Sequence, residues 1–228
     1  MDEQKASLVI SFLVLRRAIG FVGISLPLVL LASTFLTDIE IQKTLSHFYH
    51  TPMRDFFVGS LWAIGLFLFA YRGYSSERFI RLFACFCAMG VALVPTAPVC
   101  PPIDPIGELA CSTRSEGDVF DKIHMGLAAS LLLSLAYFSL VAFPKSSKKP
   151  ECQDINKSRC NVIYRICGVV ILVCIVAIGI VLWIEKRSDT IFQFQPAFWL
   201  ESVAILAFGI SWLVKGRAIL KATNPNVA

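Results

Sequence analysis

The chain has 228 residues and a net charge of +5, and 56% of its residues are hydrophobic whereas only 16% are charged. A soluble domain carries about a quarter charged residues and could not bury this much apolar surface in one core. The composition therefore excludes an ordinary soluble domain and favours an integral membrane protein. The apolar runs are continuous and do not alternate with polar residues, which favours membrane-spanning helices over a β-barrel.

The N-terminal stretch lacks the pattern of a cleaved secretory signal peptide. Its first apolar run, residues 8–15, is followed by Arg16-Arg17, where cleavage would require small residues. We expect the stretch to be retained, either as an interfacial helix over residues 6–15 or as an extension of the first span.

Six later stretches are apolar over about the 20 residues that cross a hydrocarbon core of about 30 Å. In chain order, the predicted spans are residues 18–36, 52–71, 79–94, 122–143, 163–183 and 196–214. We expect Pro27 to kink the first span, and Arg81 to direct its charge back to the surface from the short third one. The predicted fold is a single all-α membrane domain over residues 1–228, a bundle of six transmembrane helices.

The distribution of basic residues predicts the orientation of this bundle. With the N-terminus inside, fifteen of the 21 Lys and Arg fall on the inner side, among them Arg16, Arg81 and Lys215, and six fall outside. Both termini are therefore predicted to be cytoplasmic, because cytoplasmic loops carry the basic excess. The same distribution accounts for the net charge without a nucleic-acid partner. We expect the chain in a bacterial inner membrane with lipid as its partner, and its oligomeric state stays open.

The eight cysteines separate by compartment under this topology. Cys100 and Cys111 share a long outer loop, residues 96–121, whereas the others lie within spans or face the cytoplasm. A disulfide between them would close a short loop and stabilise it by about 3 kcal/mol, and two free thiols are the alternative. No spacing of cysteine and histidine predicts a structural zinc site.

Seven polar residues are predicted to lie near the outer ends of the second, fourth and sixth spans, where they could line one pocket. These candidate binding residues are His47, His50, Arg54, Asp55, Asp121, His124 and Glu201. Glu201 lies beyond the first turn of its span, and ionisable residues inside spans are often functional. Thr51-Pro52, Asp121 and Gln195-Pro196 are also typical of helix starts, in which the polar residues act as caps.

Three chemistries fit this set of side chains. His47, His50 and His124 could bind zinc through three imidazoles and leave a fourth position for water. Arg54 and the imidazoles could instead bind a lipid phosphate or a small molecule at headgroup level. Glu201 and His124 could form a proton-handling pair.

Two families resemble parts of this sequence. Residues 46–59 (SHFYHTPMRDFFVG), 90–96 (GVALVPT) and 208–213 (FGISWL) resemble an uncharacterised bacterial family of small polytopic membrane proteins. That resemblance covers most of the chain and implies the architecture without an activity.

Ser46-x3-His50, with an acid near the later His124, weakly resembles the membrane hydrolase superfamily of alkaline ceramidases and adiponectin-type receptors. That superfamily also has a His-x3-His pair in a late span, whereas no His follows His124 here. We therefore transfer no catalytic role from it.

The chain contains no Walker motif, nucleophile elbow or HExxH motif, so no complete catalytic set is present in the sequence. The sequence favours a non-enzymatic membrane protein that binds lipid or a small molecule at its outer face. A metal-dependent hydrolase acting on lipid, with zinc as cofactor, is one alternative. A small secondary transporter that uses Glu201 is the other.

Overall fold

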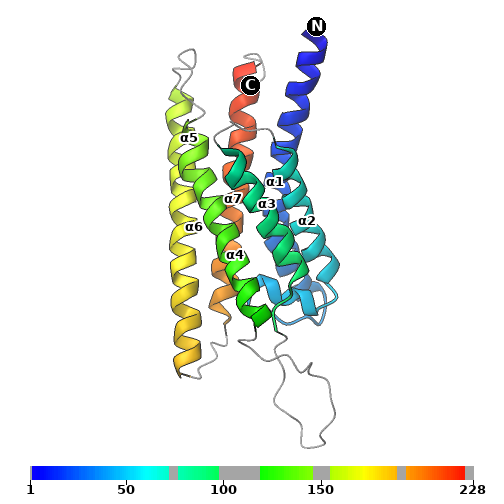
Figure 1. Cartoon of the computed structure of the whole chain (residues 1–228), viewed down its shortest axis with the longest axis vertical. Helices are drawn as coiled ribbons and strands as arrows, with labels where there is room; N and C mark the ends of the chain where they lie inside the picture. The colour runs from blue at the N-terminus through cyan, green and yellow to red at the C-terminus, as the bar shows by residue number, and fades with distance from the viewer. Residues whose placement is uncertain (1, 72–76, 98–118, 146–154, 189–193, 224–228) are drawn as a thin grey trace, which may run out of the picture.

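A computed structural model describes the backbone of residues 2–71, 77–97, 119–145, 155–188 and 194–223, and all their side chains except those of 2–13, 155–157 and 217–223. The described residues form helices and loops without strands (Figure 1). The long helices are α1 (Asp2–Leu36), α2 (Arg54–Ala70), α3 (Arg78–Leu93), α4 (Val119–Tyr137), α6 (Ile155–Ser188) and α7 (Pro196–Thr223). A 3-10 helix, η1 (Leu45–His50), precedes α2, and α4 continues through the π-helical turn η3 (Phe138–Ala142) into α5 (Phe143–Lys145).

Each of the six predicted stretches overlaps one continuous helical segment, although several ends differ from expectation; α6, for example, begins at Ile155 instead of residue 163. α1 runs unbroken from Asp2 through Pro27, so the N-terminal stretch extends the first helix and does not form a separate interfacial one. α2 begins at Arg54 instead of residue 52, because Thr51 caps a turn: its hydroxyl accepts a hydrogen bond from the Met53 amide at 3.2 Å. Gln195 directly precedes α7 in a left-handed conformation, with φ of 51°.

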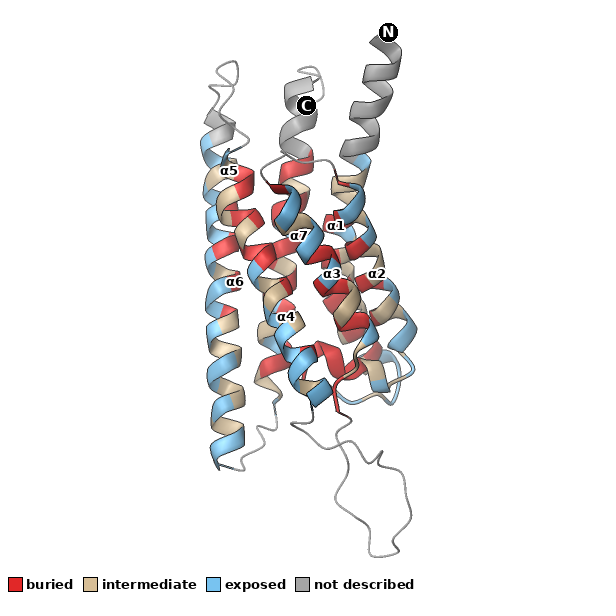
Figure 2. Ribbon diagram, in the orientation of Figure 1, coloured by how far each residue is buried: buried red, intermediate tan, exposed pale blue. Residues whose placement is uncertain are grey.

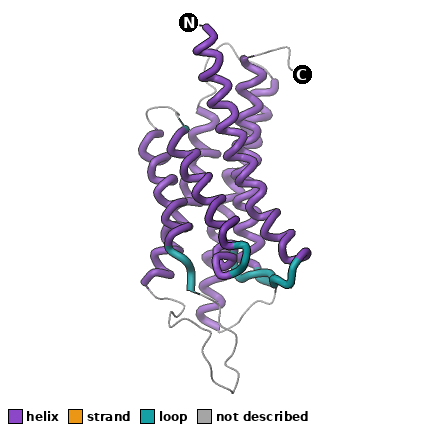
Figure 3. The backbone as a smooth tube through the Cα atoms, turned by 90° about the vertical axis from the view of Figure 1, so that its right-hand side faces the viewer, coloured by secondary structure: helices purple, strands orange, loops and turns teal. Residues whose placement is uncertain are grey.

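The six long helices form a closed ring in chain order, and Figures 1 and 3 show them as one elongated bundle from two sides. Each packs against its neighbours in the chain, and α7 closes the ring against α1. Two glycines permit this closure. A Cβ on Gly209 would lie 2.6 Å from Cγ1 of Ile24 and 2.9 Å from the carbonyl oxygen of Gly20, so a side chain there would push α1 and α7 apart.

Apolar side chains occupy both the interior and the outer surface of the ring. Figure 2 shows buried residues on the inward faces of the helices and exposed residues on their outward faces. Large side chains such as Phe208 and Trp212 are fully buried inside, whereas Phe21 and Phe86 are 63% and 66% exposed outside. Apolar residues at this exposure fit an environment of lipid chains.

Within the described part of the chain, four helical segments are long and apolar enough to cross a membrane: Val14–Leu36, Val119–Lys145, Ser158–Ser188 and Pro196–Gly216. The chain is therefore a multi-pass membrane protein. α2 and α3 are shorter, with 17 and 16 residues. At 1.5 Å per residue they reach about 26 and about 24 Å, somewhat less than the hydrocarbon core.

The ring has two distinct ends. The terminal end, at the top of Figure 1, holds the start of α1 and the end of α7. The histidine end, at the bottom, holds η1, the segment 94–97 after α3, and the first turns of α4 and α7. Figure 3 shows most of the described loops at this end.

Candidate functional site

The histidine end brings together several of the residues that the sequence analysis singled out. His47 is buried, and the charges of Lys43, His50, Asp121 and His124 act on it from close by. The start of η1 and the start of α4 therefore lie side by side. Of these groups His124 is the most buried, with 2% of its surface exposed, whereas His50 is exposed.

Three of these side chains hold the segment 94–97 through its backbone. The bonds are from His50 Nε2 to the Thr96 carbonyl (2.8 Å), from His124 Nδ1 to the Val94 carbonyl, and from the Ala97 amide to Asp121 Oδ1 (3.3 Å). A carbonyl can only accept, so these ring nitrogens carry the protons. The first turn of α4 and the end of η1 thus anchor the chain where it leaves α3.

Glu201 and His47 make hydrogen bonds at the start of η1. Glu201 Oε2 accepts a hydrogen bond from the Leu45 amide, the first of η1, at 2.8 Å. His47 Nδ1 lies 2.7 Å from the hydroxyl of Thr44, the residue before η1. Burial, with smaller contributions from Lys43 and His50, lowers the pKa of His47 to about 4, so its ring is neutral at physiological pH.

The arrangement does not support the predicted zinc site. Among the residues that the structure describes, no three His, Cys, Asp or Glu side chains are positioned to hold a metal ion. His47, His50 and His124 instead direct one nitrogen each to three different groups of the loops. The metal-dependent hydrolase would need these three imidazoles as zinc ligands, so this geometry does not support it. Cys100 and Cys111 lie outside the described residues, so the disulfide stays a prediction.

Arg54 and Asp55 lie at the start of α2 with exposed side chains. The guanidinium of Arg54 donates to the hydroxyl of Tyr49 at 2.7 Å and lies 4.4 Å from the centre of its ring. A hollow of about 300 Å³ lies next to them between α1 and α2. Its lining residues are Val22, Ser25, Asp55, Phe56, Gly59, Ser60 and Ala63.

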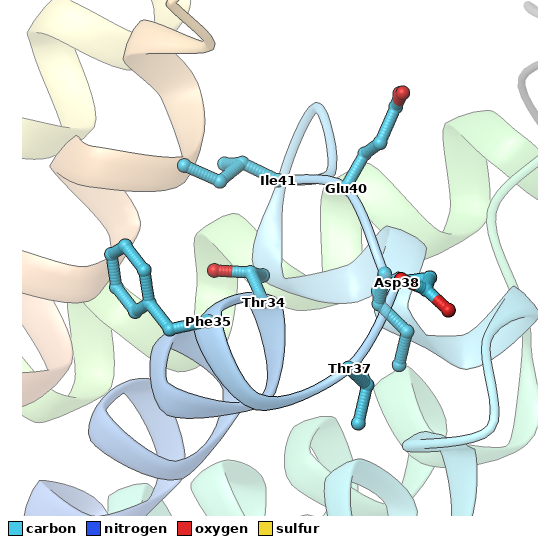
Figure 4. A pocket seen from close by; sticks show the side chains of 7 residues that line it. Thr34, Phe35, Thr37, Asp38, Glu40 and Ile41 are labelled. Atoms are coloured by element: carbon cyan, nitrogen blue, oxygen red, sulfur yellow. The ribbon is translucent and has the colours of Figure 1, made fainter.

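A second hollow, of about 330 Å³, lies in the turn that follows α1. Its lining comes from residues 34–41 without residue 36 and includes the acids Asp38 and Glu40. Figure 4 shows these two carboxylates pointing outward in different directions. The hollow therefore has no convergent polar groups of the kind that fix a ligand.

A second polar cluster, at the terminal end, was missed by the sequence analysis. Arg16 Nη2 donates to the hydroxyl of Tyr71 at 2.9 Å, and Arg81 Nη1 donates to the carbonyl of the same residue. Arg81 thus reaches the end of α2 instead of only the surface. Lys215, 4% exposed, donates to the carbonyl of Phe143 at 2.9 Å.

An aromatic group surrounds these cations. Trp212 lies edge-on to Tyr71 and to Phe143, with ring centres 5.2 Å away in both cases, and Phe143 lies 5.4 Å from Tyr164. The ammonium of Lys215 lies 5.5 Å from the ring centre of Phe143 and 5.6 Å from that of Tyr164. The sequence signal for this cluster was Lys215 directly after an apolar span, where it was interpreted only as a determinant of topology.

Comparisons with known protein families, with curated proteins and with solved structures found no match for this chain. The function is therefore inferred from the arrangement of the residues themselves.

Proposed function

We propose that the protein spans the membrane six times, with both termini in the cytoplasm of a bacterial cell, and binds a phospholipid of the outer leaflet. The common end of α1 and α7 supports an even number of crossings (Figure 1). α2 and α3 take part in the same closed ring as the four longer helices. Their lengths fall about 4–6 Å short of the hydrocarbon core, a mismatch that local bilayer thinning accommodates at modest cost. The basic residues concentrated at the terminal end support the orientation.

The binding site in this proposal is the hollow between α1 and α2. Its walls are mostly apolar or small, and its volume of about 300 Å³ lies at the lower limit of ligand sites in proteins. Gly59 supplies the open space, because a Cβ at this position would meet nothing within 4 Å. An acyl chain can lie along such a surface in contact with both helices.

The chemistry at the mouth of the hollow favours a zwitterionic headgroup. Arg54 is held by Tyr49 through one nitrogen and retains other N–H donors suited to a phosphate. Asp55, the next residue, lines the hollow and can accept from an ammonium group. Adjacent opposite charges match the phosphate and amine of phosphatidylethanolamine better than a purely anionic lipid. The proposal rests on this hollow, which Asp55 lines and which Arg54 adjoins as the preceding residue of α2.

The test uses the full-length protein in nanodiscs that contain phosphatidylethanolamine or phosphatidylglycerol, with bound lipid counted by native mass spectrometry. Gly59→Leu fills the hollow and should reduce retained phosphatidylethanolamine about tenfold, which corresponds to about 1.4 kcal/mol. Gly179→Leu is the matched control, because Gly179 also has nothing within 4 Å of an added Cβ and lies on α6.

The headgroup is tested separately. Arg54→Gln should weaken phosphatidylethanolamine binding, whereas Arg187→Gln should not, although Arg187 also lies over an aromatic ring, that of Trp183, at the same end. Equal lipid retention by Gly59→Leu and Gly179→Leu, or no preference between the two lipids, would refute the proposal.

A further inference from the structure

Three cations from three helices meet at the terminal end, opposite to the proposed lipid hollow. Arg16 comes from α1, Arg81 from α3 and Lys215 from α7. The two arginines share Tyr71 as a hydrogen-bond partner. Arg16 also lies close enough for its charge to act on both Lys215 and Tyr164. The cluster is therefore one connected site and not a row of separate surface charges.

Several donors in this cluster are buried without an acceptor among the described residues. They are Arg16 Nε, Arg81 Nε, Tyr164 Oη and Trp212 Nε1. Tyr164 and Trp212 are 1% and 0% exposed, so bulk water does not reach them. Buried donors are almost always paired in native proteins, and several unpaired donors in one place indicate a missing acceptor.

The charge in this region has the sign that attracts an anion. Among acids whose side chains the structure describes, Glu77 is the one at this end, and it is 7% exposed. Burial raises the pKa of Glu77, and the charges of Lys215 and Lys145 oppose that shift. Among the described side chains at this end, the cations Arg16, Arg81 and Lys215 outnumber this one acid, and buried positive charge favours an anionic partner.

The backbone next to this cluster contains a π-helical turn. The π-helical turn Phe138–Ala142 directly precedes Phe143, whose carbonyl binds Lys215. Such turns occur frequently at functional sites. Within the turn, Ser139 is fully buried and its hydroxyl lies 3.0 Å from that of Ser211, one helical turn before Lys215 on α7.

We propose that the terminal end binds a phosphate group between Arg16, Arg81 and Tyr164, with Lys215 and Trp212 completing the site. A phosphate offers several acceptor oxygens at once, which suits a site with several unpaired donors, and its negative charge is complementary to the two arginines. Arginine suits it because the planar guanidinium presents parallel N–H groups to two oxygens. The phosphate comes either from an anionic lipid of the inner leaflet or from a soluble phosphate compound, and both present non-bridging phosphate oxygens as acceptors.

The experiment uses the full-length protein, delipidated in detergent and then titrated with either inorganic phosphate or short-chain phosphatidylglycerol. Binding is followed as the rise in melting temperature and by 31P NMR. Wild type should bind at least one of the two probes. A response to the lipid alone identifies a headgroup site, and a response to inorganic phosphate identifies a site for soluble phosphate. A wild-type protein that responds to neither would overturn the proposal.

Variants separate a ligand site from a structural cluster. Arg81→Gln and Tyr164→Phe should each weaken binding about tenfold. Tyr164→Phe removes only the hydroxyl and keeps the ring and its packing. It therefore still tests the proposal if Arg81→Gln fails to fold. Arg78→Gln, one turn away on α3 with an exposed side chain, and Gly179→Leu on α6, outside both proposed sites, should bind within twofold of wild type. Unchanged affinity in Tyr164→Phe contradicts the assignment, as does an equal loss in Arg78→Gln.

Discussion

Lowering the pH should loosen the histidine end of the bundle through His47. This ring is 8% exposed, has Thr44 as a hydrogen-bond partner, and has a pKa lowered to about 4 from the ordinary 6.5. Burial is the main cause, and Lys43, His50 and His124 add to it, whereas Asp121 opposes it. Because the folded state binds the proton less tightly than the unfolded state, stability should fall as the pH decreases from about 6.5 towards about 4.

The size of the effect follows from the two pKa values. The full difference of about 2.5 units corresponds to about 3 kcal/mol, reached only below about pH 4. Between about pH 7 and about pH 5, roughly 2 kcal/mol of stability should be lost through this one group. For a chain of this length that is about 4–8 °C in melting temperature. Other groups titrate in the same range, so the contribution of His47 has to be isolated by substitution.

The assay compares wild type with His47→Gln in detergent by thermal unfolding over this pH range. The glutamine variant keeps a polar side chain at residue 47 but has no proton to gain, so its melting temperature should depend on pH less steeply than that of wild type. Gln42→Ala, in the loop before η1, is the control, because this substitution removes no titratable group. The reasoning fails if NMR of the imidazole gives a pKa near 6.5, or if wild type and His47→Gln have the same slope.

Two further substitutions test how the ring is held together. Glu201→Ala removes the acceptor of a backbone amide and should lower the free energy of unfolding by about 1–3 kcal/mol. Asp38→Ala removes an exposed carboxylate and should change the free energy of unfolding by less than about 1 kcal/mol, so similar losses in urea unfolding would contradict the assigned role. Gly209→Val introduces atoms where a Cβ already lies 2.6 Å from α1, and it should cost about 1–3 kcal/mol or prevent assembly. Gly126→Val, where the space is open, should fold, and a stable Gly209→Val protein would show that the close contact is not needed.

The positions of the six helices could be predicted from the sequence because hydropathy is a local property. A run of about 20 apolar residues is recognisable without knowledge of its neighbours, and all six runs coincide with helices. The gathering of His47, His50 and His124 at one end followed from the same pattern, since successive helices run in opposite directions. The membrane character of the chain could therefore be predicted from composition and from the spacing of its apolar runs.

The use of these polar groups depended on tertiary structure. His50 and His124 bind backbone groups of residues 94–97, and Glu201 binds the Leu45 amide 156 residues away in the chain. No local pattern marks a backbone amide as the partner of a distant carboxylate, so the sequence analysis expected a zinc or proton site there.

The terminal cluster shows the same division most clearly. Arg16, Arg81 and Lys215 each look like an ordinary basic residue at the end of a span, which is the interpretation that a linear sequence favours. Only the closure of α7 against α1 and the packing of α3 beside α2 bring Arg16 and Arg81 to Tyr71. Lys215 joins them from α7 through Phe143 and Tyr164. Hydropathy determined which segments are helical. The packing partners of each helix determined which charges share a buried site. Those partners cannot be read from the linear sequence, because they depend on side-chain fit between segments far apart in the chain.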